Sequence, residues 1–333
     1  MSALIGHDAA IAAFRDAAGD GRLHHAWLIT GPRGIGKARF AAVVARRLLA
    51  EAAGPPPPEA GLEVAEDHPV ARLIAAGSHP DFRRLERLPR EGSGAAGGEL
   101  ARNISIAQVR ALQALFATTP SLSARRIVVI DSVDDLERAA ANALLKNLEE
   151  PPAGTVFLLI SHAPGRLLPT IRSRCRLLAL RRLDAAATAR VIRAELPDAA
   201  EAEVAALTEL ADGAPGAALR FAGLDVAGLD AALATIAATG DPDNSARSAL
   251  ARSLALKAAQ PRYEAFLERA PAFIAGTAGA RSGTALAGAI AAWEEARALA
   301  ASAVPLVLDP HAVTFQMATL VAGLAPGAPA VKG

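Results

Sequence analysis

The chain has 333 residues and a formal net charge of +1, and 52% of its residues are hydrophobic although only 4% are aromatic. This length accommodates about two or three domains. The single cysteine excludes a disulfide framework and a zinc site built from several cysteines, and it fits a reducing compartment, so we expect a cytoplasmic protein. The balanced charge gives no overall field that would attract nucleic acid or an anionic membrane, and no signal peptide or membrane span is expected.

The first half of the chain alternates strand and helix patterns. Short apolar runs predict buried strands, and apolar residues at helical spacing predict helices. The expected strands are 24–30, 127–131, 155–161 and 176–180, and the expected helices are 37–51, 104–117, 135–149 and 167–174. Asn103 is the expected N-cap of the second helix, and stretches rich in glycine or proline at 54–61 and 91–98 predict loops. Continuous apolar strands separated by helices indicate a parallel sheet that helices cover on both faces.

The second half of the chain has a different pattern. No strand signal remains beyond about residue 184, where an alanine-rich series of helical segments begins. Glycine-rich breaks near 213–216 and 223–228 interrupt this series. We therefore expect an α/β domain at 1–182, a small all-α domain at 183–226 and an all-α C-terminal domain at 227–333.

The strongest functional signal is the run Gly31-Pro-Arg-Gly-Ile-Gly-Lys37-Ala38, which follows a predicted strand and opens a predicted helix. This is the setting of a P-loop. Gly31, Gly34 and Gly36 would let backbone N–H groups turn toward a phosphate, and Lys37 would reach the β and γ phosphates of a nucleotide. The alternative is an ordinary glycine-rich turn. Ala38 departs from the pattern, because a serine or threonine in its place would supply a hydroxyl to Mg²⁺.

A second signal is the apolar strand that ends in Asp131, since an aspartate in this place holds Mg²⁺ in P-loop ATPases. Many of these enzymes place a glutamate next, as the group that activates the attacking water, but this chain has Ser132. Asp134 and Asp135 are interpreted as acidic residues favoured near a helix N-terminus rather than as a catalytic base.

Three segments resemble the bacterial clamp-loader subunits of the AAA+ class. They are GRLHHAWLITGPRGIGKA at 21–38, SVDDLERAAANALLKNLEEPP at 132–152 and FLLISHAPGRLLPTIRSRC at 157–175. The stretch from Asn142 to Pro152 and the triplet Ser173-Arg174-Cys175 are the most diagnostic parts. The resemblance covers about residues 4–182 and implies a P-loop AAA+ domain, while the remainder is compatible with the family's helical lid (183–226) and its helical collar, or oligomerisation, domain (227–333).

The resemblance implies roles for particular residues. In that family the arginine of the Ser-Arg-Cys triplet acts in trans as an arginine finger, which makes Arg174 the expected finger for the ATP site of a neighbouring subunit. Ser161 matches the sensor-1 position. Gly216 occupies the position of the sensor-2 arginine, and Arg220 follows one helical turn later. The alternatives are that Arg174 belongs to a solvated basic edge and that Ser161 only caps a turn.

Among clamp-loader subunits the chain most resembles the kind that does not hydrolyse ATP, because Ala38, Ser132 and Gly216 each lack a group that hydrolysis uses. The resemblance implies a hetero-pentamer with gamma/tau and delta subunits, which acts with the sliding clamp and primer–template DNA in replication by DNA polymerase III. The chain itself is expected to hold no polymerase site. Its ATP binding is expected to be weak and without turnover, and the residues involved would be Gly31, Gly34, Gly36, Lys37, Asp131 and Ser161.

No zinc or other metal site is expected. Many clamp-loader subunits carry a four-cysteine zinc module after the P-loop helix, but the stretch 51–80 has no cysteine. His68 and His79 alone make a weak metal site. Cys175 is interpreted as a small buried apolar residue.

Two other functions stay open. Lys37 and Asp131 would also suit an active ATPase motor of the gamma/tau kind. A stand-alone DNA-binding protein is the other alternative, although the chain is poor in the aromatic residues that stack on single strands. Its candidate phosphate contacts are Arg83, Arg84, Arg87, Arg102 and Arg110.

Overall fold

The computed structural model describes residues 4–19, 23–55, 57, 61–90 and 100–326. The predicted loop at 91–98 and part of the one at 54–61 lie outside these residues. The chain divides into two compact units: unit 1 is Met1–Val191 with Asp212–Ala217, and unit 2 is Ile192–Ala211 with Ala218–Gly333. The predicted boundary at 226 between two helical domains stays a prediction.

Unit 1 is built around one five-stranded sheet in which all neighbouring strands are parallel. In their order across the sheet, the strands are β2 (Phe82–Glu86), β3 (Arg126–Asp131), β4 (Thr155–Ile160), β1 (Ala26–Thr30) and β5 (Arg176–Ala179). The last four agree with the predicted strands to within about two residues at either end. Because the strands run in the same direction, the carboxyl ends of β1, β3 and β4 lie at one end of the sheet, where α/β proteins place their ligands.

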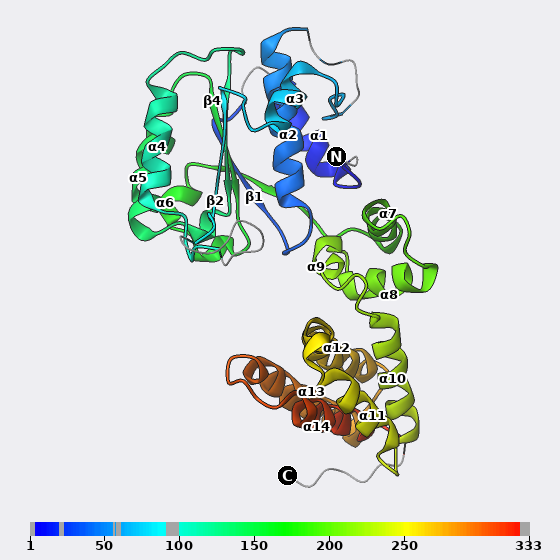
Figure 1. Cartoon of the computed structure of the whole chain (residues 1–333). Helices are drawn as coiled ribbons and strands as arrows, with labels where there is room; N and C mark the ends of the chain where they lie inside the picture. Colours follow the sequence, from blue (N-terminus) through cyan, green and yellow to red (C-terminus); the bar gives the residue numbers. More distant parts are fainter. Residues whose placement is uncertain (1–3, 20–22, 56, 58–60, 91–99, 327–333) are drawn as a thin grey trace. The chain divides into compact units, whose positions relative to one another are not determined.

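Helices cover both faces of the sheet, as Figure 1 shows. Side chains of β1 alternate between two cores, with Trp27 and Ile29 on one face and Ala26 and Leu28 on the other. The first core includes residues of α1 (Asp8–Gly19), α2 (Lys37–Ala53) and α3 (Pro69–Ala75), and the second includes residues of α4 (Ile106–Phe116), α5 (Arg138–Glu149) and α6 (Pro169–Arg172). Burial on both faces explains why the strands read as continuous apolar runs.

Local sequence decides where the helices of unit 1 begin. The N-cap of α4 is Ser105, whose side chain accepts a hydrogen bond from the Gln108 N–H while the Gln108 side chain accepts one from the Ser105 N–H. The prediction that Asn103 caps this helix was therefore wrong. The predicted helix at 135–149 starts later, at Arg138, because Val133–Asp135 forms a separate 3-10 turn, η1.

Unit 2 is entirely helical in the part of the chain that the structure describes. Its helices are α8 (Glu201–Ala211), α10 (Val226–Thr239), α11 (Ser245–Leu254), the 3-10 turn η3 (Lys257–Ala259), α12 (Gln260–Ala278), α13 (Gly283–Ala303) and α14 (Pro310–Ala322). The helices α7 (Ala185–Glu195) and α9 (Pro215–Leu219) are divided between the two units. Leu233, Phe266 and Met317 are fully buried where α10, α12 and α14 pack together. The predicted α/β domain followed by an all-α region is confirmed.

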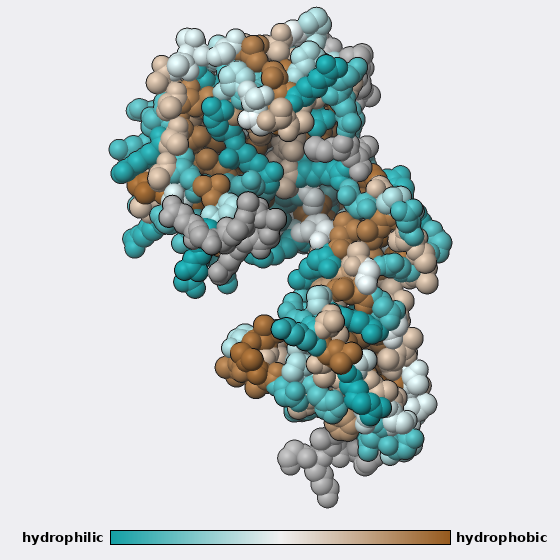
Figure 2. Space-filling view, viewed as in Figure 1, coloured by the Kyte–Doolittle hydropathy of each residue, from teal (hydrophilic) through white to brown (hydrophobic). Residues whose placement is uncertain are grey.

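An exposed apolar turn follows α13. Val304, Leu306 and Val307 are among the most exposed large apolar residues of the described chain, and Val307 is 88% exposed. In Figure 2 this turn is part of a brown, hydrophobic patch on unit 2. None of the described helices combines the length and the apolar character needed to cross a bilayer.

Candidate functional site

The predicted P-loop connects β1 to α2 at the carboxyl end of the sheet. Gly31, Gly34 and Gly36 have φ angles of 139°, 77° and 100°, which residues with side chains rarely adopt. Space is also restricted, since a Cβ atom on Gly34 would lie 2.2 Å from the backbone nitrogen of Ala217. The loop therefore depends on glycine at these positions, as the P-loop pattern requires.

Lys37 is the first residue of α2 and is only 3% exposed. Its Nζ donates hydrogen bonds to the carbonyl oxygens of Gly31, at 2.6 Å, and Pro32, at 2.7 Å. Burial lowers the pKa of Lys37 to about 8, although the nearby charge of Asp134 acts to raise it. The amine thus lies inside the loop, bonded to the loop's own carbonyl groups.

Asp131, the last residue of β3, is paired with an arginine of the neighbouring strand. Its Oδ2 accepts a hydrogen bond from Arg84 Nη2 at 2.8 Å, and the same nitrogen lies 2.9 Å from Glu86 Oε2. The register of β2 against β3 places these residues together, because Arg84 and Glu86 lie opposite Val129 and Asp131. One oxygen of the predicted magnesium ligand is therefore already bound to a cation from this chain.

These residues do not fit a Mg²⁺ site of the P-loop type. Ala38 offers no oxygen, and the Arg84 guanidinium brings to Asp131 the positive charge that a metal ion would bring. Among the described residues no group of three or more histidine, cysteine, aspartate or glutamate side chains could hold a metal ion. The loop glycines and Lys37, by contrast, are groups that suit a phosphate.

Asp134, interpreted from the sequence as an acidic residue near a helix N-terminus, lies in the first turn of η1 and is also a central residue of this site. Its carboxylate accepts hydrogen bonds from the hydroxyls of Ser132 (3.0 Å) and Ser161 (2.9 Å), and from the backbone N–H groups of His162 (2.6 Å) and Ala163 (3.3 Å). Burial alone would raise the pKa of Asp134, but these hydrogen bonds outweigh burial and lower the pKa. The carboxylate thus ties the turn after β3 to the end of β4, which is a more specific role than that of an acidic residue near a helix N-terminus.

The predicted sensor-1 residue, Ser161, follows β4 and is fully buried. Its hydroxyl donates to Asp134, so it is committed to a partner within the chain. Burial lowers the pKa of the next residue, His162, and the charges of Lys37 and Arg33 lower it further, which keeps the imidazole neutral near pH 7. The structure therefore brings Ser161 and Lys37 to one site, around the carboxyl ends of β1, β3 and β4.

Arg174 lies apart from this cluster, just after α6. Its Nη1 donates to the carbonyl oxygen of Thr170 at 2.9 Å and lies 3.4 Å from Ser173 Oγ, and its Nη2 pairs with Glu149 Oε1 at 2.8 Å. The Arg174 side chain is 34% exposed. These contacts are with α5 and with the segment of α6, and they leave the guanidinium at the surface of unit 1.

Gly216 and Arg220 were considered for the sensor-2 position. The Gly216 N–H donates to the Gly34 carbonyl oxygen at 2.8 Å, so the position lies against the P-loop but has no side chain. Arg220 belongs to unit 2, where it pairs with Glu268 and lies over the Phe221 ring at 4.3 Å. Its charge thus has a partner within unit 2.

Cys175 is half-buried against the core between the sheet and α4–α6. Burial raises the pKa of its thiol to about 12. It is therefore a small apolar residue with little thiolate at neutral pH, as interpreted from the sequence.

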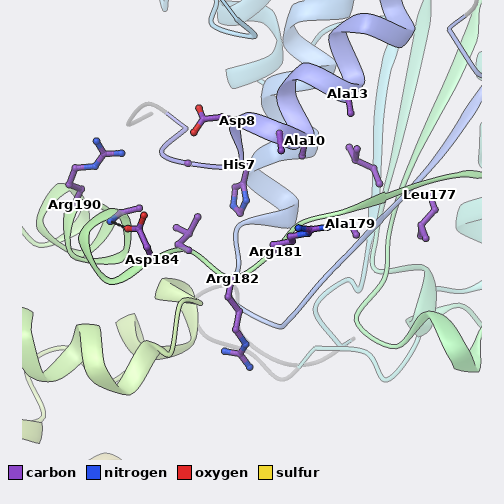
Figure 3. Close-up of a pocket in the computed structure, with 15 residues that line it drawn as sticks. His7, Asp8, Ala10, Ala13, Leu177, Ala179, Arg181, Arg182, Asp184 and Arg190 are labelled. Atoms are coloured by element: carbon purple, nitrogen blue, oxygen red, sulfur yellow. Dashed lines mark hydrogen bonds between the residues drawn. The ribbon is translucent and has the colours of Figure 1, made fainter.

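A cavity of about 600 Å³ lies beside the start of α1. Its walls are the start of α1, the strand β5 and the segment that leads into α7 (Figure 3). His7, which lines the cavity just before α1, contacts the P-loop, because its Nε2 lies 2.9 Å from the Ile35 carbonyl oxygen. Arg181, Arg182 and Arg190 also line the cavity. Sequence reasoning did not predict it, because its walls come from segments far apart in the chain.

Comparison with known proteins gives a consistent family. The family described as "DNA polymerase III, delta subunit" matches residues 6–184, more than half of the chain. The delta' subunit of DNA polymerase III from Pseudomonas aeruginosa is 39% identical over 202 residues, which are 61% of this chain and 57% of that protein. The tau subunit from Salmonella typhimurium is 31% identical over 181 residues, which are 54% of this chain and 25% of that protein.

A solved structure described as a gamma subunit-related protein from Thermotoga maritima is similar over 90% of this chain and 94% of its own, with a TM-score of 0.42 and 16% identity. The chain spans little more than half the length of the delta' relative from Pseudomonas aeruginosa. The region that the family covers includes the P-loop, Asp131, Asp134 and Arg174. The chain therefore belongs to the DNA polymerase III delta subunit family, with an α/β domain that carries the P-loop followed by an all-α region.

Proposed function

We propose that this chain is a delta-prime subunit of a bacterial clamp loader, which presents Arg174 to the ATP site of a neighbouring gamma/tau subunit and itself hydrolyses little or no ATP. The family match and the delta' relatives support the clamp-loader assignment. The proposal that Arg174 acts on a neighbour while this chain hydrolyses little ATP is supported by a contrast within unit 1. The P-loop has Ala38 where a hydroxyl would bind Mg²⁺, whereas the Ser-Arg-Cys triplet is intact and its arginine is at the surface.

Arg174 would act through charge and geometry. A guanidinium stays protonated at all physiological pH values, and its paired N–H groups match the spacing of phosphate oxygens. Placed against the γ-phosphate of ATP on the neighbour, it would stabilise the negative charge that spreads over the transferred group. Arginine fingers of this kind accelerate hydrolysis by about 10³- to 10⁵-fold.

The chain's own P-loop is a poor hydrolytic site by the same reasoning. Ala38 offers no oxygen to Mg²⁺, Arg84 already pairs with Asp131, and Ser132 cannot take a proton from an attacking water. A phosphate would also have to replace the Gly31 and Pro32 carbonyl groups as partners of Lys37. Weak binding of ATP without turnover follows from this arrangement.

The partners in this proposal are gamma/tau and delta subunits in a hetero-pentamer, assembled through the helices of the C-terminal region. The sliding clamp and primer–template DNA would be engaged by the whole complex. The role is one in DNA replication, within the DNA polymerase III holoenzyme, and it needs no polymerase site in this chain.

The test is a clamp loader reconstituted from the subunits of one bacterium. Arg174→Ala should lower DNA-stimulated ATP hydrolysis and clamp loading by at least about 10²-fold at the site that this chain faces. Arg172→Ala, at the last residue of α6 and two positions before Arg174, is the matched control and should leave both rates near the wild-type values. Unchanged rates with Arg174→Ala would refute the finger.

A second candidate is an ATPase motor of the gamma/tau kind, which the retained Lys37 and Asp131 and the similarity to tau favour. Steady-state ATP hydrolysis by the chain alone, abolished by Lys37→Ala, would establish it. A stand-alone DNA-binding function has less support. Two of its candidate phosphate contacts are paired with carboxylates, Arg84 with Asp131 and Arg87 with Asp135.

A further inference from the structure

The ion pair between Arg174 and Glu149 joins two segments that pack in the same core. Glu149 is the last residue of α5, and Arg174 follows α6. Leu148 and Ile171, one from each helix, are both 1% exposed and belong to the same core, so the two backbones are held in place by packing. The packing of the two backbones thus brings the charged side chains within reach of one another, and they meet at 2.8 Å.

Both terminal nitrogens of the Arg174 guanidinium already have hydrogen-bond acceptors within the chain. One terminal nitrogen of the guanidinium donates to the Thr170 carbonyl oxygen, and the other donates to Glu149. Two-pronged binding of a phosphate uses two N–H groups of the same guanidinium. The guanidinium has five N–H groups, so these two contacts leave some of them free, but each terminal nitrogen already has an acceptor. A phosphate bound by both terminal nitrogens would share them with Thr170 and Glu149, and its negative charge would repel the Glu149 carboxylate.

The position of Glu149 at the end of α5 makes a neighbouring cation favourable. It is in the last turn of α5, where the negative end of the helix dipole disfavours a carboxylate, and Glu150 follows it with a second negative charge. Arg174 offsets this unfavourable charge. The carboxylate and an incoming phosphate are thus competing anions for one guanidinium.

We propose that Glu149 is a built-in counter-ion that holds Arg174 in a withdrawn position, and that the γ-phosphate of ATP on the neighbouring subunit must displace it. This inference rests on the proposed role of Arg174 as a trans-acting finger. Glu149 is then a positioning residue, which sets how much ATP the neighbouring site needs before the finger engages. Once the finger has engaged, Glu149 no longer contacts it, so the maximal rate does not depend on the carboxylate.

The experiment compares Glu149→Gln with Glu150→Gln in the reconstituted loader, with ATP hydrolysis measured against ATP concentration. At about 0.05 M salt, Glu149→Gln should lower the KM for ATP by about 1.5- to 5-fold with kcat unchanged, the range expected for a partly exposed pair. The difference should vanish at about 0.5 M salt, because the side chains are 34% and 47% exposed and the pair is screened. Glu150→Gln should match the wild type at both salt concentrations.

A double variant, Glu149→Gln with Arg174→Ala, separates this proposal from the proposed function. If the effect of Glu149→Gln passes through the arginine, it should be absent in the Arg174→Ala background. A KM unchanged by Glu149→Gln, a lower kcat, or a KM effect that persists without Arg174 would each overturn the counter-ion role while the finger stands. Wild-type kinetics for Arg174→Ala alone would instead overturn the proposed function itself.

Discussion

The Asp134 carboxylate is predicted to stabilise unit 1 strongly although it lies in the short 3-10 turn η1, outside the α-helices and the strands. In the variant Asp134→Asn, one oxygen keeps its two hydrogen bonds, and an NH₂ group replaces the oxygen that accepts the other two. One of these two is donated by a backbone N–H group, that of His162 or Ala163, which would then face another donor. Hydrogen bonds to charged groups contribute about 1.5–3 kcal/mol each, so after allowing for partial exposure we expect a loss of about 2–4 kcal/mol.

The measurement is urea unfolding followed by tryptophan fluorescence in a Trp293→Phe background, so that the signal comes from Trp27. This residue is 1% exposed in β1 and therefore reports on unit 1. Asp135→Asn is the matched control, because the Asp135 carboxylate makes a long, partly exposed pair with Arg87 at 3.3 Å. We expect the control to lose less than about 0.5 kcal/mol.

The pH dependence gives an independent check. Asp134 has a pKa below its ordinary value of 3.8 in the folded chain, so the unfolded chain binds its proton more readily. The stabilisation is then complete above pH 3.8 and is lost as the pH falls through the folded pKa. The wild type and Asp134→Asn should differ by a constant amount near neutral pH and converge in acid. Equal losses for Asp134→Asn and Asp135→Asn, or a gap that widens in acid, would refute the reasoning.

Three further predictions concern the loop, its lysine and one cap. Gly34→Ala should clearly lower the melting temperature of unit 1, because Gly34 has a φ of 77° and a Cβ atom there would lie 2.2 Å from a backbone atom. Gly165→Ala is the control and should have little effect, because a Cβ atom on Gly165 would have no atom within 4 Å. The pKa of Lys37 is lowered from 10.5 to about 8 in the folded chain, so as the pH rises the folded chain loses the Lys37 proton before the unfolded chain does. The free energy of unfolding of the wild type should therefore rise relative to that of Lys37→Met between pH 8 and pH 10.5. A flat difference would contradict the burial of the amine. Ser105→Ala should cost about 1 kcal/mol in urea unfolding, and Asn103→Ala almost nothing; the opposite order would contradict the observed capping box.

Sequence reasoning located the parts of the site that depend on neighbours in the chain. The P-loop and Asp131 were found because a glycine pattern and an apolar strand are local signals, and the parallel sheet then brings them to one end. The Ser105 cap was missed although its signal was present, since Ser105 and Gln108 have the spacing of a capping box. A search for that pattern would have moved the start of α4 by two positions.

The rest of the site depends on contacts that no local pattern announces. Arg84 reaches Asp131 across 47 positions of sequence, and Ser161 reaches Asp134 across 27. Both contacts follow from strand order and register, because β3 lies between β2 and β4. An acidic residue after a strand looks the same in sequence whether it binds a metal, an arginine or two backbone N–H groups, and only the neighbouring strands decide which.

The half-buried Cys175 has a practical consequence for following Arg174 in solution. With a thiol pKa of about 12, only about one thiol in 10⁴ is ionised at pH 8, and thiolate is the form that reacts with maleimide dyes. The chain contains no other cysteine. A cysteine introduced at an exposed position such as Arg172 could therefore carry a fluorophore at a single place, with the native residue left untouched. A change in its emission would test the proposed departure of the Arg174 guanidinium from Glu149.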